Sequence, residues 1–262
     1  MVAGDVVSEN THFRPLNEDH AVAGVKFAVV LNQVLQPQAI SAAENSHEIW
    51  RESLPAASIS DVAIDAGGRQ LKAPGVLFAF LRPDGTANWS MQLGGNKIEV
   101  ECNLYSRWDR VWMSALGYLA SALSVTSQAQ NNLAVLSVEL TVRDVFVALK
   151  RPYELSHLIK IGEYFPRSVL SAGPLWHCNT GWFDDAHSGG NGHLHNLNCD
   201  AAPANNDVII NITHFQQKRL PEPVLVQALQ STLDITMKTL HEKNKTLLRE
   251  ILTQEMLTRI GL

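Results

Sequence analysis

The sequence is short of cysteine, of charge and of long apolar runs, and each shortage excludes a class of protein. Its three cysteines, among 262 residues, are too few and too unevenly spaced for a disulfide framework. Charged residues make up 18% and hydrophobic residues 45%, which is typical of a globular chain and not of a disordered one. Because no apolar run is long enough to cross a bilayer, we expect no membrane partner.

Basic charge is also scarce. The formal net charge is −5 at pH 7, whereas binding to nucleic acid normally needs a basic face that displaces counterions. The first 20 residues are polar and lack the basic-then-apolar pattern of a secretory signal. We therefore expect a reduced, cytoplasmic protein with a flexible lead-in at 1–20 and no nucleic-acid partner.

Hydrophobic spacing predicts a first sheet-plus-helix half over residues 21–150. A buried strand at 24–31 and an amphipathic helix within 37–55 come first. Three strand-like runs follow, and the turn sequences RPDG and GGN separate them. This pattern predicts an antiparallel meander with strands at 75–81, 86–93 and 97–104.

A helix and a long strand complete the first half. Ser106 with Asp109 resembles a capping box, and an amphipathic helix follows it to about residue 123. The apolar run at 133–149 then predicts one long strand.

The second half, 151–262, repeats the order of strands and helix. Its first residues look irregular, and three strand-like runs follow at 175–183, 192–200 and 207–215. Pro221 and Pro223 then begin a long helix that continues to about residue 252, since proline is tolerated in a first turn. The sequence thus predicts an α+β fold of two antiparallel three-strand-plus-helix repeats, with sheets covered on one face by helices and a long C-terminal helix.

Four features of the chain occur in a familiar order. A Y-S-x-W sequence opens a helix within NLYSRWDRVW, a strand ends in an Arg-Asp pair, and a late D-x-x-I-x-I strand precedes the C-terminal helix. Together they resemble a sporadically distributed family of uncharacterised bacterial proteins of about 260 residues. The Arg-Tyr-x-Asn strand ending of that family is changed here at Asp144 and Phe146. The resemblance implies this architecture and a bacterial origin, and it transfers no catalytic residue.

One stretch, WHCNTGWFDDAHSGGNGHLHNLNCD, holds four of the ten histidines and raises the question of a metal site. In a strand, His193 and His195 would share one face about 7 Å apart, close enough to hold one ion. His187 and the pair Asp184 and Asp185 precede them in a loop that would fold back over them. A divalent metal held by such a set would suit a hydrolytic or a structural role.

The same stretch has a simpler interpretation. Its histidines would then be half-buried strand residues hydrogen-bonded to neighbours, and its glycines would form a hairpin loop. The incomplete spacing of ligands favours this interpretation. We therefore expect no cofactor, with a divalent metal as the alternative.

Two further groups of residues are candidates for binding. Arg107, Arg110 and Arg143 would form a basic strip for a phosphate or carboxylate partner. The favoured interpretation is a solvated edge with local ion pairs to Asp109 and Asp144. Four aromatic residues would line a ligand pocket, but residues on a helix face more often belong to the core: Tyr105, Trp108, Trp112 and Tyr118.

The C-terminal helix predicts a contact with another molecule. A helix from residue 221 to about 252 would be on the order of 45 Å long, which exceeds the width of a small sheet. Its far end carries apolar residues that we expect at an interface with a protein partner or a second copy of the chain: Leu248, Ile251, Leu252 and Met256. The alternative is that these residues complete the core of the chain itself.

These observations leave two functional hypotheses. The first is a non-enzymatic binding or assembly protein of bacteria, encoded in a defence or mobile-element operon. The second is a metal-dependent hydrolase that uses the His-rich stretch at 177–195. The first is favoured because the sequence contains no recognisable complete catalytic set.

Overall fold

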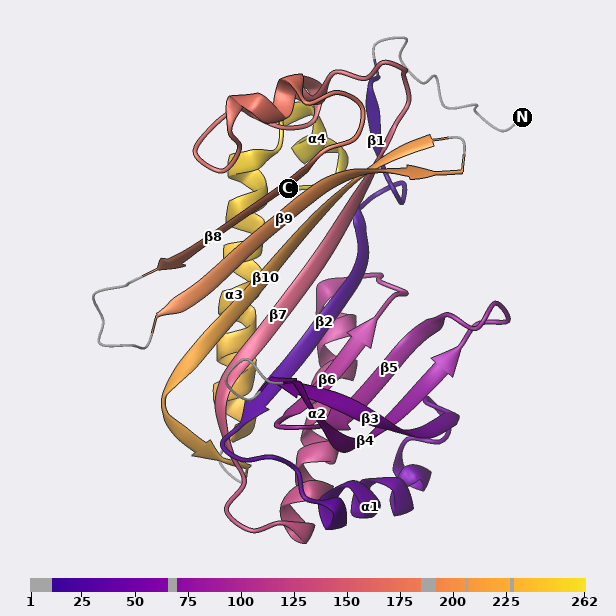
Figure 1. Cartoon of the computed structure of the whole chain (residues 1–262), viewed down its shortest axis with the longest axis vertical. Helices are drawn as coiled ribbons and strands as arrows, with labels where there is room; N and C mark the ends of the chain where they lie inside the picture. The colour runs from indigo at the N-terminus through magenta and orange to yellow at the C-terminus, as the bar shows by residue number, and fades with distance from the viewer. Residues whose placement is uncertain (1–10, 66–69, 185–191, 206, 227–228) are drawn as a thin grey trace.

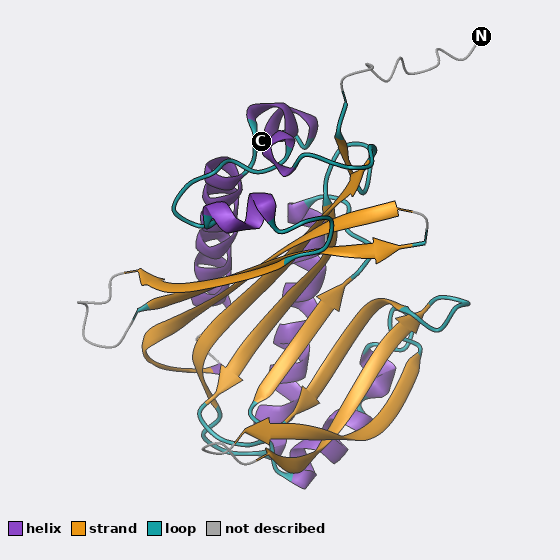
Figure 2. Cartoon of the chain, turned by 45° about the horizontal axis from the view of Figure 1, so that its top comes forward, coloured by secondary structure: helices purple, strands orange, loops and turns teal. Residues whose placement is uncertain are grey.

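A computed structural model describes residues 11–65, 70–184, 192–205, 207–226 and 229–262 of the chain. Within these residues, ten strands form one sheet in the order β3-β4-β5-β6-β2-β7-β10-β9-β8, and β1 pairs with β7 (Figures 1 and 2). The strands are β1 (Phe13–Pro15), β2 (Val22–Leu31), β3 (Ala56–Asp65), β4 (Gln70–Leu81), β5 (Ala87–Gly94), β6 (Lys97–Cys102), β7 (Ala134–Ala148), β8 (His177–Asp184), β9 (His193–Ala204) and β10 (Asp207–Leu225).

Every pairing in this sheet is antiparallel. Strands β2 and β7 lie side by side at its centre, with β6 on one side of the pair and β10 on the other. The meander predicted for the first half is confirmed as β4, β5 and β6, which pair in sequence order. The long strand predicted at 133–149 is also confirmed, as β7. The class is mixed sheet and helix, as the sequence predicts.

The described helices are α1 (Pro37–Asn45), α2 (Trp108–Ala129), α3 (Leu229–Ile251) and α4 (Gln254–Arg259), with short 3-10 turns at His47–Ile49, Leu155–His157 and Arg167–Ser171. The long helices α2 and α3 lie on the same side of the sheet (Figure 1). Helix α2 packs on β6 and β2, and α3 packs on β7 and β10. None of the helices in the described part combines the length and apolar character needed to cross a membrane.

The described apolar side chains form two cores. The first core joins β2, the meander, α1 and α2, and its largest buried residues include Trp50, Phe78 and Trp112. The second core lies beneath the end of α3, under α4 and under the irregular segment at 150–176. Helix α3 belongs to both, because its Leu229 to Leu240 stretch contributes to the first core and its Leu247 to Ile251 stretch to the second.

The C-terminal helix is shorter than the sequence predicts. Pro221 and Pro223 lie in β10, at the point where its register with β7 shifts between Arg219 and Val224. Proline is tolerated there because a bulge already interrupts the ladder of hydrogen bonds. The prolines therefore end a strand instead of starting the helix, and α3 begins at Leu229.

Other element boundaries also differ from the prediction. The predicted capping box is wrong, because the residue that precedes α2 is Arg107 and no side chain caps the helix. Strand β3, which the sequence analysis omits, pairs with β4 at the edge of the sheet. Within the predicted lead-in, the described residues 11–20 include β1, where Phe13 is fully buried and its strand pairs with β7.

The residues predicted at an interface lie inside the chain's own second core. Leu248, Ile251, Leu252 and Met256 are each at most 4% exposed. The segment that looks irregular in sequence folds back over them, and Ile159 forms a bridge with Leu252. Helix α3 ends at Ile251 and the chain turns into α4, whose Met256 and Leu257 are also buried. The apolar pattern is thus explained within one molecule.

Candidate functional site

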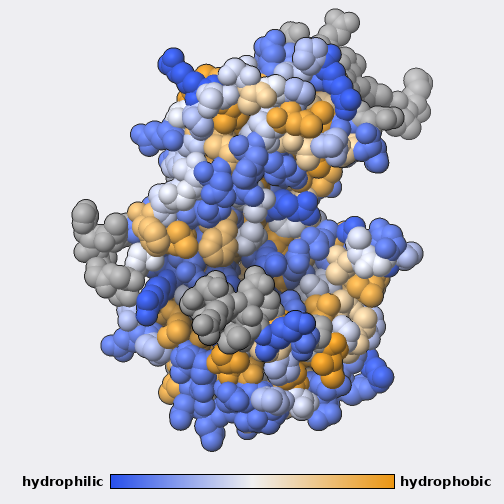
Figure 3. Space-filling model, in the orientation of Figure 1, coloured by the Kyte–Doolittle hydropathy of each residue, from blue (hydrophilic) through white to orange (hydrophobic). Residues whose placement is uncertain are grey.

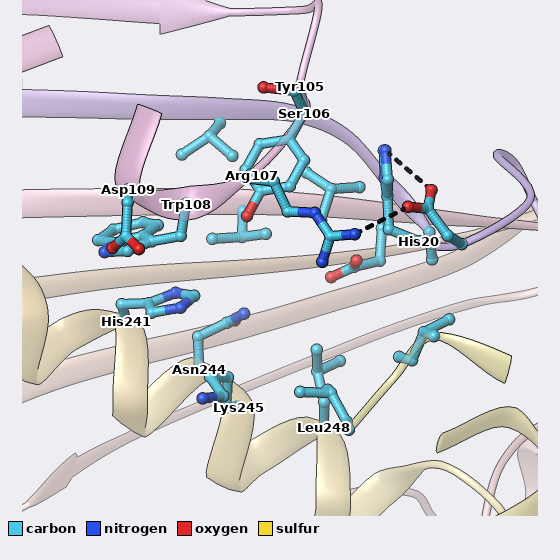
Figure 4. Close-up of a pocket in the computed structure, with 18 residues that line it drawn as sticks. His20, Tyr105, Ser106, Arg107, Trp108, Asp109, His241, Asn244, Lys245 and Leu248 are labelled. Carbon is cyan, nitrogen blue, oxygen red and sulfur yellow. Dashed lines mark ion pairs between the residues drawn. The ribbon is translucent and has the colours of Figure 1, made fainter. Parts of the chain in front are cut away.

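A cavity of about 300 Å³ lies where the two halves of the chain meet, between the start of α2, the middle of α3 and the central strands. In Figure 4, Tyr105, Arg107 and Trp108 approach it from the start of α2, and His241, Asn244 and Lys245 approach it from α3. The lining is completed by Asp19, His20, Ala21, Val22, Val25, Ser106, Asp109, Val142, Asp144, Leu248, Ile260 and Leu262.

Regular spacing places these side chains in the cavity. On α3, His241, Asn244 and Lys245 lie three and four residues apart, so they share one face of the helix. On β7, Val142 and Asp144 are two residues apart and therefore point to the same side of the sheet. Between them, Arg143 is exposed and points to the other side.

The acid Asp144 is the unusual member of this lining. It is 3% exposed, and no side chain in the described ranges forms a hydrogen bond or ion pair with its carboxyl group. Burial raises the pKa of Asp144 to about 7, because the charged form loses its hydration. Nearby, burial and then the charge of Asp144 raise the pKa of Tyr105 to about 12.

The basic groups of the cavity are paired with acids at its rim. Arg107 Nη2 lies 3.6 Å from Asp19 Oδ2, and His20 Nε2 lies 3.9 Å from Asp19 Oδ1 (Figure 4). Lys245 Nζ lies 3.1 Å from Glu242 Oε1. These pairs leave the buried carboxyl group of Asp144 without a cation among the described side chains.

An aromatic wall borders the same space. The rings of Trp108 and His241 stack with centroids 3.8 Å apart and an angle of 5° between their planes. Burial lowers the pKa of His241 to about 4, so the ring is neutral at pH 7, and its Nδ1 atom has no partner among the described residues. The cavity therefore offers a flat apolar face beside an acid.

Replacing Asp144 by Asn is expected to make the chain relatively more stable as the pH rises. Below pH 3.9, the approximate pKa of an unfolded-state aspartate, Asp144 is protonated in both the folded and the unfolded wild type. Between about pH 3.9 and pH 7, only the folded state keeps the proton. Ionisation in the unfolded chain then lowers the stability of the wild type by about 1.4 kcal/mol per pH unit. From pH 5 to pH 7 the variant should gain about 2 kcal/mol over the wild type in urea denaturation, since the slope falls off as the folded state begins to ionise near pH 7.

Asp109→Asn is the control for this comparison, because Asp109 borders the same cavity but is exposed. Its difference from the wild type should change by less than about 0.5 kcal/mol over the same pH range. A constant difference between the Asp144 variant and the wild type from pH 5 to pH 7 would contradict the assignment of the buried acid.

A second group of polar residues lies under α3 on its other side, toward the edge strands. Asp184 on β8 and His193 and His195 on β9 offer one ligand atom each, and these atoms all lie within 4.8 Å of one another. The prediction that His193 and His195 share a face is confirmed, since both are buried beneath α3 and their rings lie 4.0 Å apart. The predicted ligands His187 and Asp185 lie outside the described residues.

A chain of hydrogen bonds links this group to the cavity. His195 Nδ1 lies 3.0 Å from Nε2 of His214 on β10, and His214 Nδ1 lies 2.9 Å from Oδ1 of Asn244. Asn244 itself lines the cavity. Burial lowers the pKa of His193 to about 3 and that of His214 to about 4, and it also lowers the pKa of His195. These rings are therefore neutral near pH 7.

The other predicted binding residues are not brought together. Of the three arginines, Arg107 lies at the cavity, whereas Arg143 faces the opposite side of the sheet and Arg110 is exposed outside the cavity lining. The arginines therefore form no common strip. Of the aromatic residues, Tyr105 and Trp108 line the cavity, Trp112 is buried in the first core, and Tyr118 packs on Trp89.

Sequence analysis missed the roles of Asp144, His214 and Asn244. Asp144 carries the clearest signal, because it interrupts an alternating apolar face made of Val138, Leu140, Val142 and Phe146. A charged residue on an otherwise apolar strand face is seldom buried without a reason. His214 and Asn244 carry no comparable signal, since their contacts arise between segments distant in sequence.

Comparisons with known proteins add little to this geometry. No family model matches the chain, and no curated protein matches it. Among solved structures, the chain is similar to the di-domain ARO/CYC StfQ from the steffimycin biosynthetic pathway, at 10% identity and a TM-score of 0.13. The match covers 87% of this chain and 50% of that one, so the chain spans about half the length of the structure it matches. A TM-score this low carries no argument about fold or function.

Proposed function

We propose that the chain is a non-enzymatic binding protein whose cavity between α2 and α3 takes a small organic cation. The observation that carries the proposal is the carboxyl group of Asp144, which is 3% exposed, lines the cavity and has no partner within the described ranges. A buried charge is costly unless it is paired. A bound cation would supply the pair.

The other walls of the cavity fit the same class of ligand. A cation is attracted to the face of an aromatic ring, and Trp108 and Tyr105 both line the space. The basic groups Arg107 and Lys245 are already paired with acids at the rim, so they compete little for Asp144. A volume near 300 Å³ lies at the small end of the range for ligand pockets.

The position of the cavity supports a fold built from two related halves, which is part of this proposal. The series β4, β5, β6 and α2 has the same order as β8, β9, β10 and α3, and the two series flank the central pair β2 and β7. Ligand sites occur preferentially at interfaces between such units. The cavity takes side chains from α2 of the first half and α3 of the second.

The proposed role is binding of a ligand and not assembly with another chain. The residues predicted at an assembly interface are buried in the second core: Leu248, Ile251, Leu252 and Met256. On the face seen in Figure 3, apolar surface occurs as separate patches among hydrophilic residues, and such scattered patches are normal for a globular surface.

The experiment is a titration of the purified chain with benzylammonium, an aromatic cation, and with benzyl alcohol, its neutral analogue. Calorimetry should show that the cation binds at least tenfold more tightly than the alcohol at pH 8, since only the cation pairs with the ionised carboxyl group. The preference should fall about tenfold per pH unit below pH 7, as Asp144 takes up a proton.

Two variants complete this titration. Asp144→Asn should bind cation and alcohol equally, whereas Asp207→Asn, at an exposed acid outside the cavity lining, should keep the preference. The groups that face the cavity with Asp144 are Asp19, His20, Tyr105, Arg107, Asp109, His241 and Lys245. Equal binding of the two probes by the wild type at pH 8 would refute the proposal, as would a preference that survives in the Asp144 variant.

A further inference from the structure

Two neighbouring strands bring three metal-binding side chains together beneath α3. Asp184 on β8 is directly opposite His193 on β9, and Trp182 is directly opposite His195. Side chains at such opposed positions lie on the same face of the sheet. The ring of Trp182 stacks on His195 with centroids 4.9 Å apart, which fixes the plane of that imidazole. The three ligand atoms therefore meet on a rigid sheet and not on a loop.

One ring nitrogen of this group has no hydrogen-bond partner. His193 Nε2 is buried, and nothing among the described residues bonds to it. A buried polar atom without a partner lowers stability, so it calls for a ligand, a water molecule or an ion. Because burial keeps this ring neutral near pH 7, a ring nitrogen remains available to coordinate a metal.

The hydrogen-bond chain through His214 leaves His195 Nε2 with a free lone pair that also faces this site. Asn244 Oδ1 can only accept a hydrogen bond, so His214 Nδ1 donates to it, and His214 Nε2 then accepts from His195 Nδ1. His195 Nε2 is thereby left unprotonated, 3.1 Å from Asp184 Oδ2. Two acceptors at this distance repel each other unless a cation lies between or beside them, and the ammonium group of Lys243, which pairs with Asp184 Oδ2, now takes that place.

The alternative to a cation is a reversed hydrogen-bond chain. If the amide of Asn244 is turned over, its nitrogen donates to His214 and His195 Nε2–H donates to Asp184. That arrangement satisfies His195 and Asp184 without an ion, but it leaves His193 Nε2 without a partner. A metal satisfies all three groups.

Lys243 is the competitor that a metal would displace. Its Nζ atom forms a short ion pair with Asp184 Oδ2, and its side chain is 41% exposed. Although burial opposes it, the hydrogen bond from Lys243 holds the pKa of Asp184 below its ordinary value. The ion pair holds the carboxylate at the site, and the flexible ammonium group can move into solvent.

We propose that Asp184, His193 and His195 bind a divalent transition-metal ion, zinc in particular. Two imidazoles and one carboxylate suit zinc, whereas magnesium and calcium prefer ligand sets made of oxygen alone. His214 bonds to the far nitrogen of the His195 ring, and Asn244 bonds to His214 in turn. These two residues therefore orient the His195 ring, as the outer partners of metal-bound histidines commonly do. The metal ligands do not line the cavity, so the metal site and the cation-binding cavity can each be refuted independently.

The test is a competition titration of the chelator-treated chain with Zn²⁺ against a chromophoric chelator, together with Co²⁺ absorption. His193→Gln and His195→Gln should each lower Zn²⁺ affinity at least a hundredfold, and Asp184→Asn at least tenfold. His177→Gln is the matched control, because His177 lies on β8 but is exposed and hydrogen-bonded to Asn198. It should stay within twofold of the wild type.

A fourth variant should bind zinc more tightly. Lys243→Gln removes the competing ammonium group, so its Zn²⁺ affinity should rise several-fold, a change that misfolding cannot produce. The Mg²⁺ affinity of the wild type should be at least a hundredfold weaker than its Zn²⁺ affinity. The proposal is overturned if the wild type binds Zn²⁺ no more tightly than His193→Gln, if His177→Gln loses as much as the site variants, or if Lys243→Gln gains nothing.

Discussion

Replacing Leu248 and Leu252 together by glutamate is expected to unfold the chain. Both side chains are buried in the second core, at 4% and 0% exposure. Each glutamate would place a carboxyl group among apolar neighbours, which costs several kcal/mol per group, whether the group stays charged or takes up a proton. Since domains of this kind are stable by about 5–15 kcal/mol, two such changes remove most or all of the stability. Circular dichroism and solubility of the purified variant provide the measurement.

The same helix supplies a matched control. Ile235 and Thr239 have the same i, i+4 spacing on α3 and are both exposed, Ile235 at 66%. Ile235→Glu with Thr239→Glu should leave the chain folded, with a change in unfolding free energy below about 1 kcal/mol. If the Leu248 and Leu252 variant were folded and had a smaller mass than the wild type in light scattering, those leucines would belong to an intermolecular contact after all.

Replacing Trp112 by alanine is expected to lower the unfolding free energy by about 3–5 kcal/mol, as for other large buried aromatics. Trp112 is 2% exposed, and its ring lies 5.4 Å from Phe27 and 6.3 Å from Trp108. Its Nε1 atom also donates a hydrogen bond of 2.8 Å to Asp234 Oδ1 on α3, so it ties the two long helices together. Urea denaturation with an unchanged m-value measures the loss.

Two further variants separate packing from the hydrogen bond. Trp112→Phe keeps most of the apolar volume, so its loss of unfolding free energy should be smaller than that of Trp112→Ala. The difference between the two losses should be about 2 kcal/mol or more. Met113→Ala tests the adjacent position, which is 66% exposed, and should cost less than about 0.5 kcal/mol. A loss below about 1 kcal/mol for Trp112→Ala would mean that this face of α2 does not carry the core.

The parts of the fold that the sequence predicts are those with a local signal. The turn sequences RPDG and GGN predict the meander, and an apolar run predicts β7. Strand β3 lacks such a signal, since it pairs at the edge of the sheet and its Ile59 is 62% exposed. The prediction that the prolines of β10 start a helix is wrong because local preference cannot distinguish a bulged strand end from the first turn of a helix.

The candidate sites were predictable only in part, for a related reason. The His-x-His pattern places two ligands on one face from strand geometry alone. Their neighbours are supplied by pairing between segments that are far apart: His214 from β10, and Lys243 and Asn244 from α3. Asp144 was expected in a surface ion pair beside Arg143, but alternation along β7 sends the two side chains to opposite faces.

Helix α3 carries a constraint on length that is stricter than any constraint on its residues. Lys243 reaches Asp184 while Asn244, the next residue, lines the cavity, and the stretches on either side of them belong to different cores. Insertion or deletion of one residue between Leu240 and Leu247 would turn everything after it by about 100°. Both polar sites and the second core would then lose their contacts at once. Homologous chains should therefore differ freely in the exposed residues of α3 while keeping its number of residues in this stretch.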